Sequence, residues 1–203
     1  MSMTILYPLE DSLYVNITNR CNCNCTFCIR SVKDHVRQSD RLWLEHEPTI
    51  EEVLEAAKAF DFRQYREIVF CGFGEPTERL DDLLKIASIW KEEQPSLVIR
   101  INTNGLADLQ YQENTAERMA GIIDKVSVSM NASTKEHYLE LTRSRFGIQS
   151  YEAMLRFAVH CKECGIDVRY SIVDVLPPEE IEACQNISAQ MGVPLKIRKF
   201  VSD

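Results

Sequence analysis

Short apolar runs alternate along this 203-residue chain with longer stretches of helical periodicity, and this alternation restricts the possible folds more than any other feature. Runs such as Ile68-Val69-Phe70 are apolar on both faces, as buried parallel strands are. Strands separated by helices indicate βαβ units with right-handed crossovers. The predicted strands are Ser12–Thr18, Glu67–Cys71, Leu97–Asn102, Lys125–Met130, Asp167–Val173 and Leu195–Val201.

The helical stretches between these strands have recognisable ends. Thr49 and Glu52 have the spacing of a capping box, Gly165 is placed to stop a helix, and Pro177-Pro178 can open another. We therefore expect one helix starting after Thr49, one along Leu80–Trp90, one over about Ser150–Cys164 and one over about Glu179–Met191.

The number of predicted strands selects among the α/β architectures. Six strands are two fewer than a full eight-fold barrel uses, and such a barrel typically takes about 250 residues. An α/β fold in the form of an open, partial (β/α)6 TIM-like barrel with parallel strands fits the length. A flavodoxin-like open sheet is the alternative. We expect residues 1–203 to form a single domain.

Charge and hydropathy narrow the class of protein. The net charge of −8 does not favour nucleic acid as a partner, because phosphate contacts require the opposite sign. No run approaches the ~18 apolar residues of a membrane span, and Met1–Glu10 does not resemble a signal peptide. We therefore expect a cytoplasmic protein without membrane association, whose eight cysteines are thiols or metal ligands rather than disulfides.

Four of the eight cysteines lie between Cys21 and Cys28, at the start of the longest segment without periodicity. The spacing Cys21-x3-Cys25-x2-Cys28 offers three thiolates. Cubane iron–sulfur clusters usually take four cysteines, so three would leave one iron open for another ligand. By itself this spacing also fits a zinc site, and Cys23 permits a second register.

Further polar motifs follow the predicted strands. The second strand is followed by Gly72-Phe73-Gly74-Glu75-Pro76, where two glycines would let the backbone approach a ligand closely. The third strand ends at Asn102-Thr103-Asn104-Gly105, and the fourth at Ser129-Met130-Asn131. Short polar side chains at the carboxyl ends of parallel strands are typical of binding sites.

The cysteine spacing, with Phe27 as the aromatic residue of C-x3-C-x-aromatic-C, resembles the signature of the radical S-adenosylmethionine (SAM) superfamily. The resemblance implies an oxygen-sensitive [4Fe–4S] cluster held by Cys21, Cys25 and Cys28, with SAM on the fourth iron. It further implies an enzyme that cleaves SAM reductively to a 5′-deoxyadenosyl radical, which abstracts hydrogen from a substrate that the sequence does not identify. It names no catalytic side chain.

The same resemblance suggests where SAM binds. Gly72-Phe73-Gly74-Glu75-Pro76 is similar to the superfamily's Gly-Gly-Glu-Pro motif, with Phe73 in place of a glycine. Residues after the third and fourth strands would hold the ribose, and Arg143 the SAM carboxylate, although Asn104 could instead cap a turn and Arg143 could be a solvated helix-end residue. The implied cofactor-binding residues are Phe27, Gly72, Gly74, Glu75, Asn104, Ser129, Asn131 and Arg143.

Within the superfamily, the chain resembles the short group found beside TatD-type metal-dependent hydrolases. The resemblance implies a radical SAM core domain and an electron donor such as a flavodoxin or ferredoxin. A core of this size leaves the open side of the barrel uncovered, so we expect a large substrate or partner protein to cover the barrel mouth.

Two other hypotheses compete with this interpretation. One is a zinc protein in which Cys161 and Cys164 join Cys25 and Cys28, and the other is a non-catalytic iron–sulfur module acting through a partner protein. Outside the cysteine loop we expect Cys71 and Cys184 in the core and the four histidines at surface or loop positions. Of the cations Lys196, Arg198 and Lys199 on the last strand, one is a candidate to point into the barrel mouth.

Overall fold

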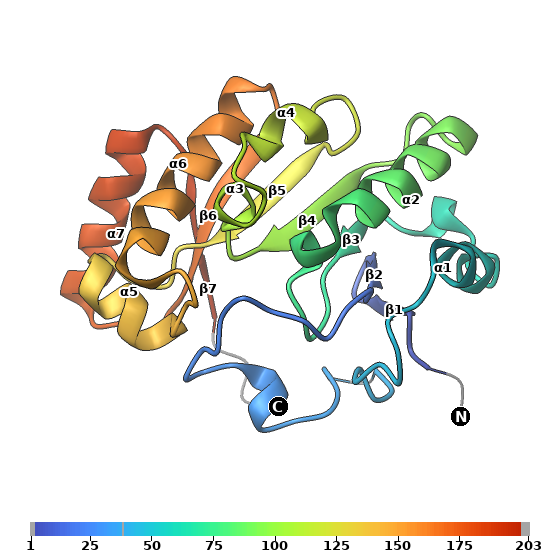
Figure 1. The fold of residues 1–203 in the computed structure, drawn as a ribbon, viewed down its shortest axis with the longest axis horizontal. Helices are drawn as coiled ribbons and strands as arrows, with labels where there is room; N and C mark the ends of the chain where they lie inside the picture. Colours follow the sequence, from blue (N-terminus) through green and yellow to red (C-terminus); the bar gives the residue numbers. More distant parts are fainter. Residues whose placement is uncertain (1–2, 38, 200–203) are drawn as a thin grey trace. The chain divides into compact units, whose positions relative to one another are not determined.

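The computed structural model describes residues 3–37 and 39–199 as an α/β protein built around one sheet (Figure 1). Seven strands of the described chain follow one another in sheet order as they do in sequence. They are β1 (Leu6–Leu9), β2 (Ser12–Val15), β3 (Glu67–Phe70), β4 (Ile99–Thr103), β5 (Lys125–Ser129), β6 (Asp167–Val173) and β7 (Leu195–Arg198).

The pairing of these strands decides between the two predicted architectures. β2 pairs with β3, β3 with β4 and β6 with β7 in parallel, whereas β1 and β2 are antiparallel. A flavodoxin-like sheet would reverse its strand order at a switch point, and the consecutive order β1 to β7 contains no such reversal. The prediction of an open, partial TIM-like barrel is therefore confirmed, and the structure adds the antiparallel strand β1 to the predicted parallel strands.

Strand β1 was absent from the sequence prediction. It is four residues long and contains Pro8, whose missing N–H is tolerated in an edge strand. Glu10 adopts a left-handed φ of 56° in the turn to β2, where glycine or asparagine would be the usual indication of a hairpin. β6 has the predicted bounds, whereas β7 ends at Arg198; Phe200 and Val201 of its predicted range lie outside the described residues.

The four predicted helices are all present. The capping box before α1 is formed in full: Thr49 Oγ1 accepts from the Glu52 N–H (3.2 Å), and Glu52 Oε2 accepts from the Thr49 N–H (2.8 Å). The structure adds three short helices and four 3₁₀ turns. The helices are α1 (Ile50–Ala57), α2 (Leu80–Glu93), α3 (Ala107–Tyr111), α4 (Thr115–Met119), α5 (Lys135–Thr142), α6 (Ser150–Glu163) and α7 (Pro178–Met191), and the turns are η1 (Ile29–Ser31), η2 (Phe62–Gln64), η3 (Pro76–Arg79) and η4 (Gly147–Gln149).

The described residues fall into two compact units. The first contains residues 3–21, 28–37, 39–102 and 121–125, and the second contains residues 22–27, 103–120 and 126–199. The first buries the apolar stripe of α2 and strands β2 to β4, and the second buries the inner sides of α5 and α6 and strands β5 and β6. A single domain over the whole chain stays a prediction. No helix in the described parts is long and apolar enough to cross a membrane.

Candidate cofactor site

The cysteines of the loop after β2 differ in burial. Cys21, Cys25 and Cys28 are half-buried, whereas Cys23 is only 4% exposed, with its thiol 3.6 Å from Asn22 Oδ1. All eight cysteines are free thiols. Cys21 and Cys28 belong to the first unit, and Cys23 and Cys25 to the second. Burial thus separates Cys23 from the three thiols that the spacing predicts as ligands.

No three His, Cys, Asp or Glu side chains of residues 3–37 and 39–199 converge on a point where one metal ion could bind. A cubane makes a different demand, because each thiolate binds its own iron atom and the ligands need not meet at one point. Cys21, Cys25 and Cys28 are three accessible thiols in one loop, and thiolates are the ligands that an iron–sulfur cubane takes. Their role as cluster ligands stays a prediction.

In the first unit, the glycine motif after β3 packs directly on the segment that leads into Cys21. A Cβ added to Gly72 would lie 2.0 Å from Asn16 Oδ1, and one added to Gly74 would lie 2.3 Å from the Thr18 carbonyl oxygen. The Glu75 N–H donates to the Arg20 carbonyl oxygen at 2.8 Å. Both glycines are therefore required by the close approach of the chain itself.

The remaining residues of this motif are also held in place. Glu75 is 4% exposed, and its Oε1 accepts from the N–H (3.1 Å) and hydroxyl (2.8 Å) of Thr77 at the start of η3. Glu75 is therefore a buried, hydrogen-bonded residue of the turn and not a solvated one. Phe73, which replaces a glycine of the family motif, packs with Tyr7 and Leu42 in a small apolar cluster.

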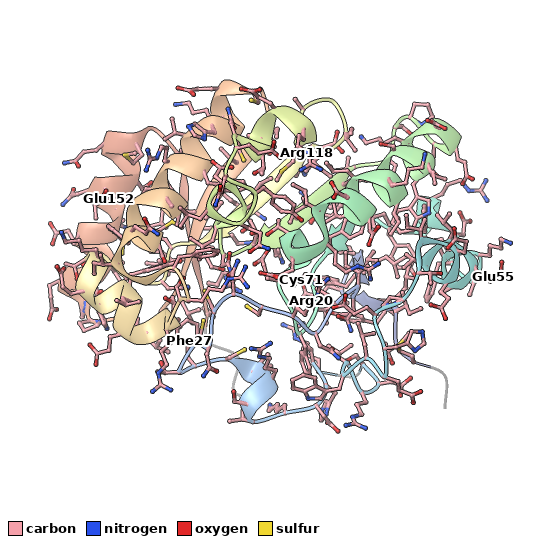
Figure 2. All side chains as sticks on the ribbon, viewed as in Figure 1. Arg20, Phe27, Glu55, Cys71, Arg118 and Glu152 are labelled. Atoms are coloured by element: carbon pink, nitrogen blue, oxygen red, sulfur yellow. The ribbon has the colours of Figure 1, made fainter. Side chains whose placement is uncertain are left out.

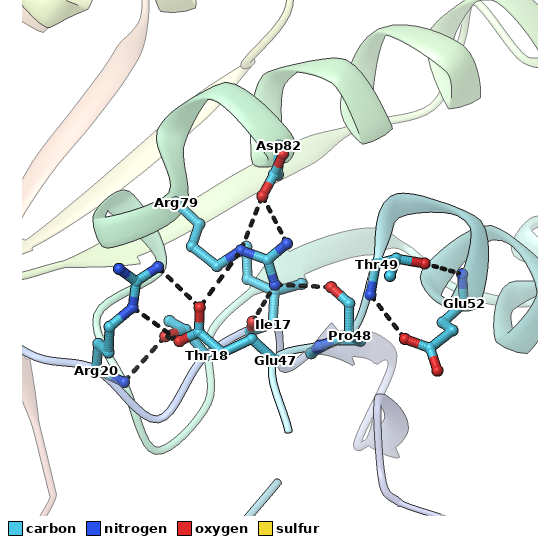
Figure 3. A network of polar contacts seen from close by, with 9 residues as sticks. All are labelled: Ile17, Thr18, Arg20, Glu47, Pro48, Thr49, Glu52, Arg79 and Asp82. Carbon is cyan, nitrogen blue, oxygen red and sulfur yellow. Dashed lines mark hydrogen bonds and ion pairs between the residues drawn. The ribbon is translucent and has the colours of Figure 1, made fainter. Parts of the chain in front are cut away.

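A network around Arg79 and Glu47 fixes the residues that precede Cys21 (Figure 3). Arg79 donates through Nη1 to the carbonyl oxygens of Ile17 (2.7 Å) and Pro48 (2.8 Å), and through Nε to Asp82 (2.8 Å). Its side chain is only 10% exposed. One buried guanidinium thus joins the end of β2, the segment before α1 and the first turn of α2.

Glu47 completes this network from the other side. Its carboxylate accepts from the Thr18 hydroxyl and from Arg20, whose Nε and Nη2 each lie 2.8 Å away. Partial burial would raise the pKa of Glu47, but the hydrogen bonds from Thr18 and Arg20 and the charges of Arg20 and Arg79 outweigh burial and hold it below its usual value. Glu47 is therefore a carboxylate at neutral pH.

Arg30 supports the loop after Cys28. Its Nη1 donates to the carbonyl oxygens of Asn19 (3.1 Å) and Phe73 (3.4 Å). Sequence analysis assigned no structural role to Glu47, Arg79 or Arg30. These side chains form no local motif, and Arg79 bonds to a carbonyl 62 residues away in sequence.

In the second unit, the segment around Cys25 is bound to the carboxyl end of α5. The N–H groups of Asn24 and Thr26 donate to the carbonyl oxygens of Thr142 and Leu141, each at 2.9 Å. These bonds flank Cys25 on both sides and satisfy carbonyls that a helix end otherwise leaves free. The loop is thereby held at its central cysteine by backbone contacts.

Asn104 has one of the two roles considered for it, that of a turn-capping residue, and it also contacts the cysteine loop. Its Oδ1 accepts from the Leu106 N–H (3.1 Å), as a turn-capping residue does, while its Nδ2 donates to Asn22 Oδ1 (2.6 Å) and lies 3.5 Å from Cys23 Sγ. Asn104 therefore supports the cysteine loop from the end of β4. A role in binding SAM stays a prediction.

The other predicted SAM contacts lie in the second unit as well, apart from the glycine motif. Ser129 is half-buried at the end of β5, and Asn131 follows it with a left-handed φ of 61°. Arg143 is exposed at the carboxyl end of α5, immediately after the Thr142 carbonyl that binds Asn24. Phe27, labelled in Figure 2, is 47% exposed.

The remaining cysteines are placed mainly as predicted. Cys161 and Cys184 are buried, and burial raises the pKa of both thiols, that of Cys184 to about 11. Cys71, which was expected in the core, is only half-buried. The four histidines each lie beside a carboxylate, in the pairs His35–Asp34, His46–Glu52, His137–Glu180 and His160–Asp108.

Comparison with known sequences supports the interpretation of the motifs. A profile described as "Radical SAM superfamily" matches residues 15–188. A GTP 3′,8-cyclase from Corynebacterium glutamicum strain R is 32% identical over 197 residues, which cover 88% of this chain and 47% of the relative. Molybdenum cofactor biosynthesis protein 1 of Drosophila melanogaster is 27% identical over 198 residues, covering 94% of this chain and 33% of the relative. The chain thus spans between a third and a half of the length of these two relatives.

Solved structures show the same fold. Streptococcus suis SuiB bound to S-adenosylmethionine superimposes with a TM-score of 0.67 at 18% identity, covering 95% of this chain and 41% of SuiB. The structure described as anSMEcpe with bound AdoMet gives a TM-score of 0.60 at 16% identity, covering 93% of this chain and 50% of that one.

Proposed function

Because this chain belongs to the radical SAM superfamily, a family of enzymes whose cofactors are a [4Fe–4S] cluster and SAM, we propose that it starts a hydrogen abstraction. When bound, the cluster and SAM supply a one-electron cleavage that yields methionine and a 5′-deoxyadenosyl radical, which takes a hydrogen atom from the substrate. The protein positions and shields this chemistry. The observation that carries the proposal is a loop with three half-buried thiols. Backbone hydrogen bonds fix Asn24 and Thr26, on either side of Cys25, and Arg79 binds the Ile17 carbonyl oxygen shortly before Cys21.

Cys21, Cys25 and Cys28 would hold the cluster. Because Cys23 is buried and lies against Asn22 and Asn104, it would not occupy the fourth iron. The fourth iron would then stay open for the amino-acid end of SAM.

The backbone of Gly72–Glu75 would face SAM, since that segment is anchored to the residues before Cys21. Ser129 and Asn131 offer hydrogen-bonding groups for the ribose, Arg143 a cation for the carboxylate, and Phe27 an aromatic ring for contact with the cofactor. The amide of Asn104 is already engaged with Asn22, so its part would be to hold the loop that contacts SAM.

The substrate and the partners belong to this proposal too. GTP is the first substrate to test, because several of the curated relatives are GTP 3′,8-cyclases. A flavodoxin or ferredoxin would supply the electron. A large substrate or partner protein would cover the open side of a single radical SAM core domain.

Anaerobic reconstitution tests the proposal. The purified protein should bind iron and sulfide and, with SAM and dithionite, release 5′-deoxyadenosine. Cys25→Ala should abolish that product, whereas Cys23→Ala, a matched loss of one thiol from the same loop, should retain it. Zinc without iron would support the zinc hypothesis, and a loaded cluster that gives no product above Cys25→Ala would support a non-catalytic module.

A further inference from the structure

We propose that the side of β5–β7 facing away from α6 binds a phosphate or carboxylate group of the substrate, through Arg169, Lys196 and Arg198. The inference rests on the proposed function, because it assigns a chemical class to the substrate of that reaction. All of the residues that carry it belong to the second unit.

Hydrogen bonds and register define this face of the sheet. Tyr170 Oη donates to the Leu155 carbonyl oxygen of α6 at 2.8 Å, so Tyr170 lies on the helix side of β6. Neighbouring side chains in a strand point to opposite faces, which places Arg169 and Ser171 on the other side. Ser171 is paired with Lys196, and Val173 with Arg198, in the parallel register of β6 and β7. Both cations of β7 therefore share the face of Ser171.

The same face leads to Ser129. The Met130 N–H donates to the Ser171 carbonyl oxygen at 2.9 Å, which is the bond made in a parallel pair when Ser129 lies opposite Ser171. Ser129, Ser171 and Lys196 thus form a row across three strands. With strands about 4.8 Å apart, the backbones of Ser129 and Lys196 are about 10 Å apart. A small substrate whose anionic group binds Lys196 could then also reach Ser129, the proposed contact to the SAM ribose.

Within residues 3–37 and 39–199, no acidic side chain compensates the charges on this face. No carboxylate of the described residues forms an ion pair with Arg169, Lys196 or Arg198, although the chain carries 31 acidic residues against 23 basic ones. Asp167 shares the face but lies at the amino end of β6, away from the carboxyl end where Arg198 lies. Asp174, whose N–H donates to the Arg198 carbonyl oxygen at 2.9 Å, comes after the end of β6 and forms no ion pair with these cations. Three cations whose one acidic neighbour on the strand face is distant favour an anionic ligand.

Charges on an edge strand can also serve to prevent pairing with other sheets. That role would explain Lys196 and Arg198 on β7 but not Arg169, which lies on β6 between β5 and β7. Lys196 and Arg198 are about 6.6 Å apart along the strand, a spacing at which two long side chains can reach separate oxygens of one anionic group. The arrangement thus fits a ligand better than edge protection alone.

Titration of small anions into the cluster-loaded, SAM-bound protein tests the inference. Pyrophosphate represents a phosphate ligand and citrate a carboxylate ligand, so their relative affinities distinguish the two sources. In Lys196→Gln/Arg198→Gln, the dissociation constant of the preferred anion should rise about tenfold or more. The control Lys135→Gln/Arg156→Gln removes the same charges from exposed positions of α5 and α6 and should change it less than about twofold.

Three outcomes would overturn the inference: neither anion binds the wild-type protein, both double variants weaken binding equally, or SAM affinity falls as much as anion affinity. The third would assign the cations to the SAM carboxylate. Melting curves verify that each variant is folded. Release of 5′-deoxyadenosine by the wild-type protein is measured in the same preparation, so failure of the proposed function is recognised separately.

Discussion

Replacing Gly74 by alanine tests whether the glycine motif holds the start of the cysteine loop. The added Cβ would lie 2.3 Å from the Thr18 carbonyl oxygen and 2.5 Å from that of Arg20. Both contacts are with backbone, so neither can be relieved by rotating a side chain. The segment before Cys21 would have to move away from the motif.

The expected loss of stability has two parts. Overpacking in a well-packed region costs about 1–3 kcal/mol. Movement of residues 18–20 would also weaken the 2.8 Å hydrogen bond from the Glu75 N–H to the Arg20 carbonyl oxygen, worth about 1 kcal/mol. A total of about 2–4 kcal/mol corresponds to a fall in melting temperature of about 4–16 °C for a chain of this size.

The assay combines thermal melting with iron content after anaerobic reconstitution. Gly74→Ala should melt lower and retain less iron per chain than the wild-type protein. Gly121→Ala is the comparison, because its added Cβ meets nothing within 4 Å although its φ of +77° carries a backbone cost of about 1–2 kcal/mol. It should lose stability without losing iron. Full iron content and an unchanged melting temperature in Gly74→Ala would refute the packing argument.

Three further predictions concern buried polar groups. Arg79→Met should lower stability in urea denaturation by about 2–3 kcal/mol, because it leaves the carbonyl oxygens of Ile17 and Pro48 without their donor. Arg79→Lys should restore only part of this loss, since an ammonium lacks the fixed donor geometry of a guanidinium. Full recovery of stability in the lysine variant would contradict this. Burial by itself would raise the pKa of Glu67, but the hydrogen bonds and charge of Arg100 and the charge of Lys125 outweigh burial and lower it. The ion pair therefore stabilises the fold above the unfolded pKa of about 4.3, and this stabilisation is lost as the pH falls through the lower pKa of the folded state. The stability difference between wild type and Glu67→Gln should thus shrink from pH 7 to pH 3.5, and a constant difference would contradict it. Burial raises the pKa of Cys184 to about 11, so little of it is thiolate at pH 8. Iodoacetamide should therefore label Cys184 at pH 8 about a hundredfold more slowly than free cysteine, as measured by mass spectrometry. Comparable labelling rates would contradict this, because they would show an accessible thiolate.

Local periodicity and end signals were sufficient to predict most of the sheet and the longer helices. β6 was located with its bounds, and α1 with its capping box, because each depends on neighbouring residues. β1 was missed because Pro8 and Glu10 are not typical of a strand and a hairpin turn. The short helices α3 to α5 offer too few turns for a clear apolar stripe.

The candidate site was predictable only where it depends on spacing. The three thiols and the glycine motif are contiguous patterns. The spacing left Cys23 as part of a second possible register, and its burial now sets it apart from the other three thiols. The network of Glu47 and Arg79 could not be predicted, because it joins residues from the end of β2, the segment before α1 and the start of α2. Such partners are neighbours only after the chain has folded.

The two backbone bonds between the Cys25 segment and α5 link the order of the loop to the fraying of that helix. If the last turn of α5 opens, the N–H groups of Asn24 and Thr26 lose their acceptors. A ligand that orders the loop must, by reciprocity, stabilise the closed helix end by the same coupling free energy. Substitutions in α5 that contact no cysteine would therefore change the fraction of molecules in which the Cys25 segment is ordered. Amide hydrogen exchange at Asn24 and Thr26 would report that coupling directly.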